Sequence, residues 1–165
     1  MGVERLGGGK TGAVAITAAT NVYGIFGDPV IHSLSPLMQN AAFAACGINA
    51  VYLPFNVTKA NLDAAVLGAK AMNVRGVNVT IPHKEAVCPL LDSIDGSAQL
   101  IGAVNTIVNS DGCLVGYNTD GVGLVRSLRS DLGVDLNGNV QVVVLGAGGA
   151  ARAAVVALAQ QGVKA

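Results

Sequence analysis

The chain has 165 residues, of which 52% are hydrophobic and 12% are charged. Ten basic and ten acidic side chains cancel, so the chain offers no broad positive field for nucleic acid or an anionic membrane. An anionic ligand would therefore have to be held by a few local groups.

The three cysteines, Cys46, Cys88 and Cys113, stand far apart, and no Cys/His spacing suggests zinc or any other metal site. Their odd number argues against a disulfide framework, so we interpret them as reduced residues, mostly in the core, of a cytoplasmic protein. No apolar run reaches the roughly 18 residues of a membrane span, and the first residues do not have the layout of a signal peptide.

The Gly-rich opening segment, residues 1–20, is predicted to be a flexible tail. Within it, "GGGKTG" is similar to part of a phosphate-binding P-loop. That motif requires a glycine five places before Gly9, where this chain has Glu4, and it also requires a preceding strand. The segment therefore fails the motif in both spacing and context.

From residue 21 onward, short β-like runs alternate with Ala-rich helical runs. This pattern predicts strands at 21–27, 50–57 and 74–81, and helices at 35–47 and 58–72. We expect Ser35 to cap the first helix, Pro36 to occupy its first position and Gly47 to end it. After the third strand, Pro82 suits the first position of a short helix, which would place Lys84 in its first turn.

The segment 103–119 predicts a β-hairpin, because two alternating apolar runs flank "NSDG". A helix is predicted at 120–133, followed by a polar turn. From residue 140, an apolar strand runs through a Gly-rich turn into a helix. Alternating elements indicate an α/β fold whose first sheet the hairpin makes mixed. We expect residues 21–137 to form one domain and 138–165 to be the opening β-α unit of a Rossmann-type domain.

The Gly-rich turn matches the dinucleotide motif G-x-G-x-x-[GA] at Gly146, Gly148 and Ala151. Here the motif follows an apolar strand and opens a helix, which is the context that it needs. The glycines allow a tight turn and close approach of a pyrophosphate to the helix N-terminus. The alternative is a Gly-rich packing turn. The predicted cofactor-binding residues are Gly146, Ala147, Gly148, Gly149 and Ala150.

Polar side chains gather where an open α/β sheet keeps its ligands, directly after strands or at helix starts. Ser33 and Ser35 could seat a carboxylate at a helix terminus, or Ser35 could only cap the helix. Lys84 breaks the preference for anions at a helix start and is a candidate functional residue, although it could also be a solvated surface lysine. Asn105 interrupts an apolar strand and could make only a structural hydrogen bond. Asp120 opens a helix, where it could act only as a cap.

In their order and spacing, these motifs resemble the shikimate dehydrogenase family. The matching stretches, over roughly residues 22–160, are "YGIFGDPVIHSLSPLMQNAAF", "GVNVTIPHKEAV", "GAVNTIV", "GYNTDGVG" and "VVVLGAGGAARA". The family reduces 3-dehydroshikimate to shikimate with NADPH, in aromatic amino-acid biosynthesis. The resemblance therefore implies NADP as cofactor and shikimate or 3-dehydroshikimate as the small-molecule partner, and it leaves a homodimer open. Since family members continue into a full second domain, it also implies that the chain ends inside that domain.

The resemblance assigns roles residue by residue. It implies that Ser33 and Ser35 hold the substrate carboxylate and that Lys84 is the catalytic lysine, paired with Asp120. The other substrate-binding residues that it implies are Asn78, Thr80, Asn105 and Asp120, the last two as ligands of ring hydroxyls. Three alternatives remain: a quinate/shikimate dehydrogenase that prefers NAD, a related two-domain dehydrogenase such as a methylenetetrahydrofolate dehydrogenase, and a non-catalytic shikimate-binding fragment. The double-serine segment and "GYNTDG" argue against the second.

Overall fold

The structure is a computed structural model that describes residues 16–137 and 139–163. Most of the predicted tail, with the "GGGKTG" segment, lies outside the described residues. Among the residues that are described, no helix has both the length and the apolar character needed to cross a membrane.

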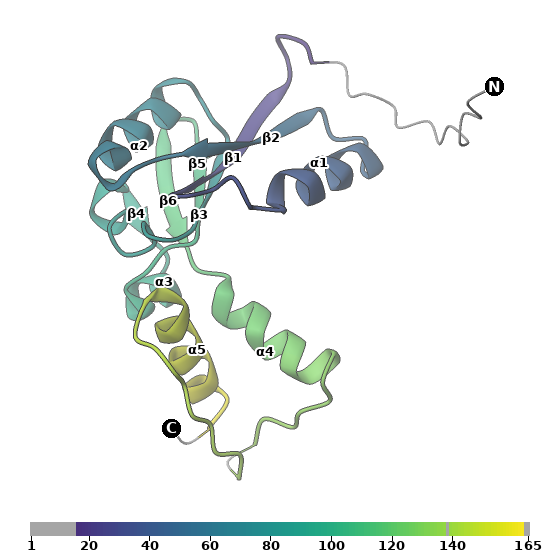
Figure 1. The fold of residues 1–165 in the computed structure, drawn as a ribbon, viewed down its shortest axis with the longest axis vertical. Coiled ribbons are helices and arrows are strands. Elements are labelled where there is room, and N and C mark those ends of the chain that lie inside the picture. Colours follow the sequence, from purple (N-terminus) through teal and green to yellow (C-terminus); the bar gives the residue numbers. More distant parts are fainter. Residues whose placement is uncertain (1–15, 138, 164–165) are drawn as a thin grey trace, which may run out of the picture.

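A single mixed sheet organises the molecule (Figure 1). Its six strands within the described residues follow the order β2-β1-β3-β5-β6-β4. Strand β1 pairs parallel with β2 and β3, whereas β5 is antiparallel to β3 and β6. The strands are β1 (Asn21–Gly27), β2 (Ala50–Asn56), β3 (Gly76–Val79), β4 (Ser93–Ile94), β5 (Thr106–Ser110) and β6 (Cys113–Tyr117). The predicted α/β class with a mixed sheet is confirmed.

Helices pack beside and below this sheet (Figure 1). The α-helices are α1 (Ser35–Ala45), α2 (Leu62–Ala71), α3 (Gly96–Ile101), α4 (Asp120–Ser130) and α5 (Gly149–Gln160). Two short 3-10 helices are η1 (Lys59–Asn61) and η2 (Cys88–Leu90). Gly47, with φ of 66°, follows the end of α1, as the sequence predicts.

The two faces of the sheet differ in what covers them. Phe26, Val77 and Val79 join the main core together with residues of α2. Because side chains alternate along a strand, Asn78 points to the other face. On that face Tyr52 belongs to a smaller cluster against which Phe43 of α1 packs. The alternation thus places a polar residue of β3 on the side of the sheet that α1 covers.

The predicted hairpin is confirmed as β5 and β6. Its turn residues Asp111 and Gly112 have φ of 51° and 89°, the left-handed values that a tight two-residue hairpin requires. The sequence reading named no element between residues 86 and 103, where the structure has α3. Asp95 accepts the Ser97 N–H at 3.0 Å, and Gly102 ends the helix with φ of 71°. These cap and stop signals were readable in the sequence.

Three local expectations are wrong. Apart from an isolated bridge residue at Gln141, residues 140–147 form no strand, and the side chains of Val143 and Leu145 are 86% and 93% exposed. A strand needs a hydrogen-bonded neighbour, and no part of the described chain pairs with 142–147. Residues 82–87 form turns rather than a helix. Cys46 and Cys113 are exposed and free rather than in the core.

Helix α5 packs against α4 at very short range (Figure 1). A Cβ atom on Gly121 would lie 2.8 Å from the Ala153 carbonyl oxygen and 2.8 Å from the Ala157 Cβ. Only a glycine therefore allows this approach. The contact matters for the site because α5 begins at the Gly-rich turn.

Candidate active site

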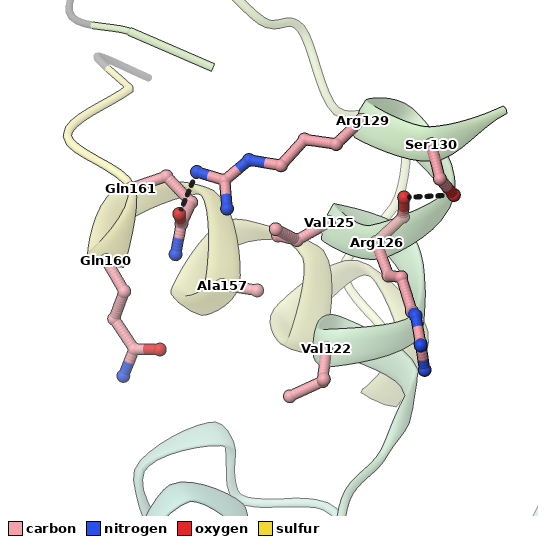
Figure 2. A pocket seen from close by; sticks show the side chains of 8 residues that line it. All are labelled: Val122, Val125, Arg126, Arg129, Ser130, Ala157, Gln160 and Gln161. Atoms are coloured by element: carbon pink, nitrogen blue, oxygen red, sulfur yellow. Dashed lines mark hydrogen bonds between the residues drawn. The ribbon is translucent and has the colours of Figure 1, made fainter. Parts of the chain in front are cut away.

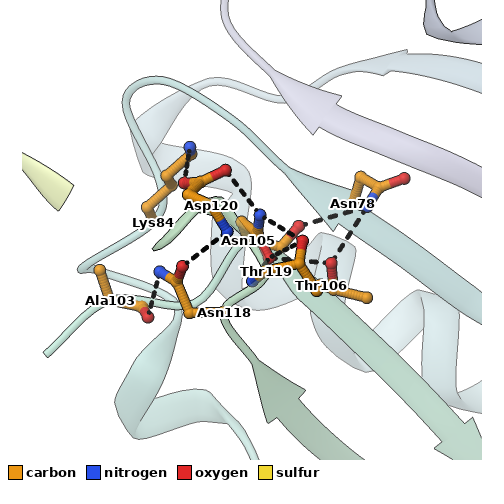
Figure 3. Close-up of polar contacts among 8 residues, drawn as sticks. All are labelled: Asn78, Lys84, Ala103, Asn105, Thr106, Asn118, Thr119 and Asp120. Carbon is orange, nitrogen blue, oxygen red and sulfur yellow. Dashed lines mark hydrogen bonds and ion pairs between the residues drawn. The ribbon is translucent and has the colours of Figure 1, made fainter. Parts of the chain in front are cut away.

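Lys84 and Asp120 form an ion pair at the centre of the site. The Lys84 Nζ donates to Asp120 Oδ2 at 2.6 Å, although the residues are 36 positions apart in the chain. Lys84 lies in the turn after β3, and Asp120 opens α4 directly after β6 (Figure 3). Their side chains are 18% and 30% exposed, so a ligand in the adjacent space can reach both.

Asp120 does not cap its own helix. Its Oδ2 faces Lys84, and its Oδ1 accepts from Asn105 Nδ2 at 2.8 Å. The cap-like bond comes instead from Asn118, whose Oδ1 accepts the Asp120 N–H at 3.0 Å. Because Asn118 Nδ2 also donates to the Ala103 carbonyl at 3.0 Å, the start of α4 is tied to the segment that carries Asn105, which lies just before β5 rather than within a strand.

Asn105 is only 9% exposed, and its amide is fully used (Figure 3). Its Nδ2 donates to Thr119 Oγ1 at 2.9 Å as well as to Asp120. Its Oδ1 accepts from the Thr119 N–H at 3.0 Å and from Thr106 Oγ1 at 2.9 Å. Both N–H groups are thus spent on the protein, and this geometry favours Asn105 as the residue that orients Asp120.

The lysine turn is held at both ends. The Val104 N–H donates to the Lys84 carbonyl at 2.7 Å, which fixes the turn beside the Asn105 segment. His83, fully buried, places its Nε2 2.6 Å from the Val57 carbonyl just beyond β2. The other ring nitrogen of His83 has no hydrogen-bonding partner among the described residues. His83, to which the sequence assigned no role, therefore anchors the turn that carries Lys84.

Ser33 and Ser35 lie half-buried at the start of α1. The predicted Ser35 cap is wrong: α1 begins at Ser35 itself, the N-cap residue is Leu34, which makes no side-chain cap bond, and Ser33 Oγ accepts the Ser35 N–H at 3.2 Å. The loop before them is held by Asn56, whose Oδ1 accepts the Val30 N–H at 3.2 Å. The Ser35 hydroxyl makes no cap bond to the helix and neighbours Tyr52.

Asn78 forms hydrogen bonds both to Tyr52, near the serine pair, and to Thr106, near Asn105. Its Oδ1 accepts from the Tyr52 hydroxyl at 2.7 Å, and its Nδ2 donates to Thr106 Oγ1 at 3.2 Å. Burial raises the pKa of Tyr52 to about 12, while hydrogen bonding by the neighbouring Ser35 opposes part of that rise. Tyr52 is therefore a neutral donor at ordinary pH, next to the serine pair. Thr80 lies apart from this network and lines the cavity described next.

A cavity of about 740 Å³ opens between the lysine turn and the glycine turn. Thr80 and Lys84 line one side, and Gly146, Gly148, Gly149 and Ala150 line the other. A Cβ on Gly149 would lie 3.0 Å from the Ala103 Cβ and 3.3 Å from the Lys84 Cβ. The predicted cofactor turn and the predicted catalytic lysine are therefore neighbours in space.

An ion pair joins the two turns. Arg152 of α5 lies 3.0 Å from Glu85, next to Lys84, and its Nε donates to the Ala147 carbonyl at 3.3 Å. Ala147 is the one predicted cofactor residue that does not line the cavity. In the described part of the chain, no cluster of three or more His, Cys, Asp or Glu side chains could hold a metal ion.

A second groove of about 590 Å³ lies between α4 and α5 (Figure 2). Arg126 and Arg129 line it over an apolar floor that includes Val122 and Ala157. Arg129 is tied to Gln161 Oε1 at 2.6 Å. The groove holds none of the predicted site residues, so we place the chemistry at the cavity beside Lys84.

A family model described as the shikimate dehydrogenase substrate binding domain matches residues 25–107. The match includes both serines, the lysine turn and Asn105. The chain belongs to this family.

Similarity to known proteins extends beyond the residues that the family model matches. A Moorella thermoacetica protein named shikimate dehydrogenase (NADP(+)) is 57% identical over 149 residues, which cover 90% of this chain and 50% of the relative. Crystal structures of shikimate dehydrogenase from Aquifex aeolicus, and of shikimate 5-dehydrogenase from Listeria monocytogenes with shikimate and NAD, superimpose with TM-scores of 0.86 and 0.83. They are 47% and 46% identical, and the matches cover 91% and 90% of this chain but 56% and 51% of theirs. The chain spans about half the length of the curated relatives that it matches.

The sequence reading missed polar residues that complete the network. These are Tyr52, Thr106, Asn118 and Thr119, together with the anchor His83. Asn118 and Thr119 carried a readable signal, because they stand between a strand and a helix start beside Asp120. Tyr52 and Thr106 carried none, since they look like ordinary strand residues.

Proposed function

We propose that this chain provides the substrate-binding half of a shikimate dehydrogenase, an oxidoreductase that reduces 3-dehydroshikimate to shikimate with NADPH in aromatic amino-acid biosynthesis. In this proposal, residues 21–137 are the substrate-binding domain and residues 138–165 begin the dinucleotide-binding domain. The observation that carries it is the pair of Lys84 and Asp120, 2.6 Å apart beside a cavity. The match to the substrate binding domain model supports the choice of substrate.

Each site residue has a separate role in this proposal: substrate binding, orientation of Lys84 or proton donation. Ser33 and Ser35 hold the substrate carboxylate through neutral hydroxyl donors at the start of α1. Asp120 accepts from a ring hydroxyl while it orients Lys84, and Asn105 holds that carboxylate in place. Asn78 and Thr80 complete the substrate contacts. Lys84, with two N–H groups beyond the one that Asp120 accepts, donates a proton to the C3 carbonyl oxygen as it becomes a hydroxyl.

The glycine turn fits a dinucleotide. Gly146 has φ of 124°, which favours glycine, and a Cβ on Gly148 would meet no atom within 4 Å. Backbone N–H groups at the start of α5 would face a pyrophosphate at Gly146, Gly148 and Gly149. When bound, NADPH supplies the hydride that reduces C3.

Calorimetric titration with shikimate tests the proposal. We expect binding to the wild-type chain and, for Ser33→Ala with Ser35→Ala, a loss of about tenfold or more, because hydrogen bonds to a charged group contribute about 1.5–3 kcal/mol each. Lys70→Ala is the control, since Lys70 forms a surface pair with Asp92 at 2.8 Å. Absence of binding, or equal loss in the control, would contradict the proposal.

Cofactor preference distinguishes a second candidate function from the proposed one. A quinate/shikimate dehydrogenase that uses NAD would employ the same residues, and the Listeria relative was solved with NAD. Titration with NADP and NAD, followed by quinate competition against shikimate, distinguishes the two. Shikimate binding with no oxidation of NADPH in the presence of 3-dehydroshikimate would instead favour a non-catalytic binding fragment.

The cellular compartment and the oligomeric state are part of the same proposal. We assign the enzyme to the cytoplasm, where thiols such as those of Cys46 and Cys113 stay reduced. A homodimer remains a prediction, and sedimentation equilibrium distinguishes it from a monomer.

A further inference from the structure

The polar groups of the site form a chain of hydrogen bonds with a single direction. Tyr52 OH donates to Asn78 Oδ1 at 2.7 Å, and Asn78 Nδ2 donates to Thr106 Oγ1 at 3.2 Å. Thr106 Oγ1 donates to Asn105 Oδ1 at 2.9 Å, and Asn105 Nδ2 donates to Asp120 Oδ1 at 2.8 Å. We call these five residues the amide–hydroxyl relay. Every donor in it points toward the Asp120 carboxylate.

Backbone groups fix this direction independently. The Thr119 N–H can only donate, and it faces Asn105 Oδ1 at 3.0 Å, so Asn105 Nδ2 must face Asp120 (Figure 3). The Asn105 carbonyl can only accept, and it faces Asn78 Nδ2 at 3.4 Å. Asn78 Oδ1 therefore faces Tyr52, whose hydroxyl must be the donor.

The strand register explains how the relay forms. Asn78 and Thr106 are direct cross-strand partners of β3 and β5, so their side chains meet on the same face. Tyr52 stands on β2 and reaches Asn78 across β1. Tyr52 as a whole is 4% exposed. Three of the five relay residues, Tyr52, Asn78 and Thr106, thus stand on strands of the sheet.

A buried chain of donors that ends on a carboxylate has a functional consequence. Each bond polarises the next, and the last one holds Oδ1 of Asp120 in place while Oδ2 faces Lys84. At its other end, Tyr52 lies beside the helix start that carries the serine pair, where hydrogen bonding with Ser35 affects its hydroxyl. The relay therefore connects the two ends of the proposed substrate site.

We propose that Tyr52 and Thr106 are positioning residues that align Asp120 with Lys84 through the amide–hydroxyl relay. The effect on the ligand rests on the proposed function, because shikimate is the probe. Tyr52→Phe removes the first donor while keeping the ring, so Asn78 Oδ1 loses its partner and the amide, held only through Nδ2 by the Asn105 carbonyl and Thr106, shifts out of alignment. The misalignment then passes to Asn105 and Asp120, neither of which Tyr52 contacts by hydrogen bond.

Double-mutant cycles with shikimate calorimetry on the full chain test this. We expect Tyr52→Phe to weaken shikimate binding about fivefold. In the background of Asp120→Asn the same change should cost less than about twofold, because the carboxylate that the relay serves is gone. Tyr23→Phe is the matched control, since Tyr23 packs against Phe43 and takes no part in the relay. Thr106→Val should lose affinity like Tyr52→Phe, whereas Thr106→Ser should retain it.

A ligand-free measurement keeps the relay distinguishable from the proposed function. In nuclear magnetic resonance spectra of Tyr52→Phe, the side-chain amide of Asn105 should shift, and that of Asn109, which donates to Val74 at 3.0 Å, should not. If shikimate binds but Tyr52→Phe weakens binding by the same factor with and without Asp120→Asn, the relay is overturned and the proposed function stands. If shikimate does not bind, the proposed function fails, and an unmoved Asn105 amide overturns the relay as well.

Discussion

Two glycines of α4 provide a matched test of how the glycine turn is held against the substrate-binding region. Gly121 and Gly123 stand two residues apart on one helix, so alanine should raise the helix propensity of both by about 1 kcal/mol. A Cβ at Gly123 meets no atom within 4 Å, whereas a Cβ at Gly121 lies 2.8 Å from the Ala153 carbonyl oxygen. That oxygen belongs to the backbone of α5 and cannot yield without moving the helix.

The free energies then separate the two variants. Overpacking of a close contact costs about 1–3 kcal/mol, so Gly121→Ala should be less stable than Gly123→Ala by about that amount. For a chain of this size the difference corresponds to a Tm gap of about 2–4 °C per kcal/mol. Urea and thermal unfolding, followed by helical circular dichroism, measure both quantities. If Gly121→Ala proved as stable as Gly123→Ala, α5 would not pack on α4 as described, and the cavity between the lysine and glycine turns would lose its support.

Lys84→Ala should lower kcat by about 10²–10⁴ in steady-state assays and change shikimate affinity far less, because proton donation belongs to the transition state; equal losses would argue against a proton donor. Ser33→Ala should lower the free energy of unfolding by about 1 kcal/mol, because Ser33 accepts the Ser35 N–H, whereas Ser35→Ala should lower it less; thermal melts of both variants decide, and the reverse order would indicate that Ser35 caps the helix. The pKa of Tyr52 rises from 10.0 to about 12 on folding. The neutral Tyr52 hydroxyl therefore contributes about 2–3 kcal/mol to the free energy of unfolding, and this contribution is fully present below pH 10 and is lost as pH rises toward 12. Tyr52→Phe, unfolded by denaturant across that range, should not show this loss, and identical pH profiles would contradict the assignment.

Local signals in the sequence predicted the features that local physics decides. The hairpin followed from Asp111 and Gly112, whose backbone angles are those of the turn. The alternation of strands and helices gave the mixed α/β class, and Gly47 marked the end of α1. The pairing of Lys84 with Asp120 came from the family resemblance, because spacing along the chain carries no information about two turns that meet in space.

The features that the sequence did not predict depend on contacts between segments that are distant in the chain. Residues 142–147 have the composition of a buried strand, but a strand requires a partner, and none of the described residues supplies one. Tyr52 and Thr106 join the site only through the register of three strands. Helix α1 begins at Ser35 rather than directly after it, a one-residue difference within the range where helix boundaries are set by geometry rather than by sequence.

The charges of the site explain why a nearly neutral chain can serve an anionic substrate. Lys84 and Asp120 cancel each other at 2.6 Å, so the pair attracts a distant carboxylate weakly. In the proposed function, the substrate carboxylate is bound instead by the neutral hydroxyls of Ser33 and Ser35 at the positive end of α1. In the proposed reaction, the two remaining N–H groups of Lys84 are then available to the oxygen on which negative charge develops during reduction. Stabilisation that is stronger in the transition state than in the bound substrate is the kind that accelerates a reaction, and in our proposal the amide–hydroxyl relay serves it by aligning Asp120 with Lys84.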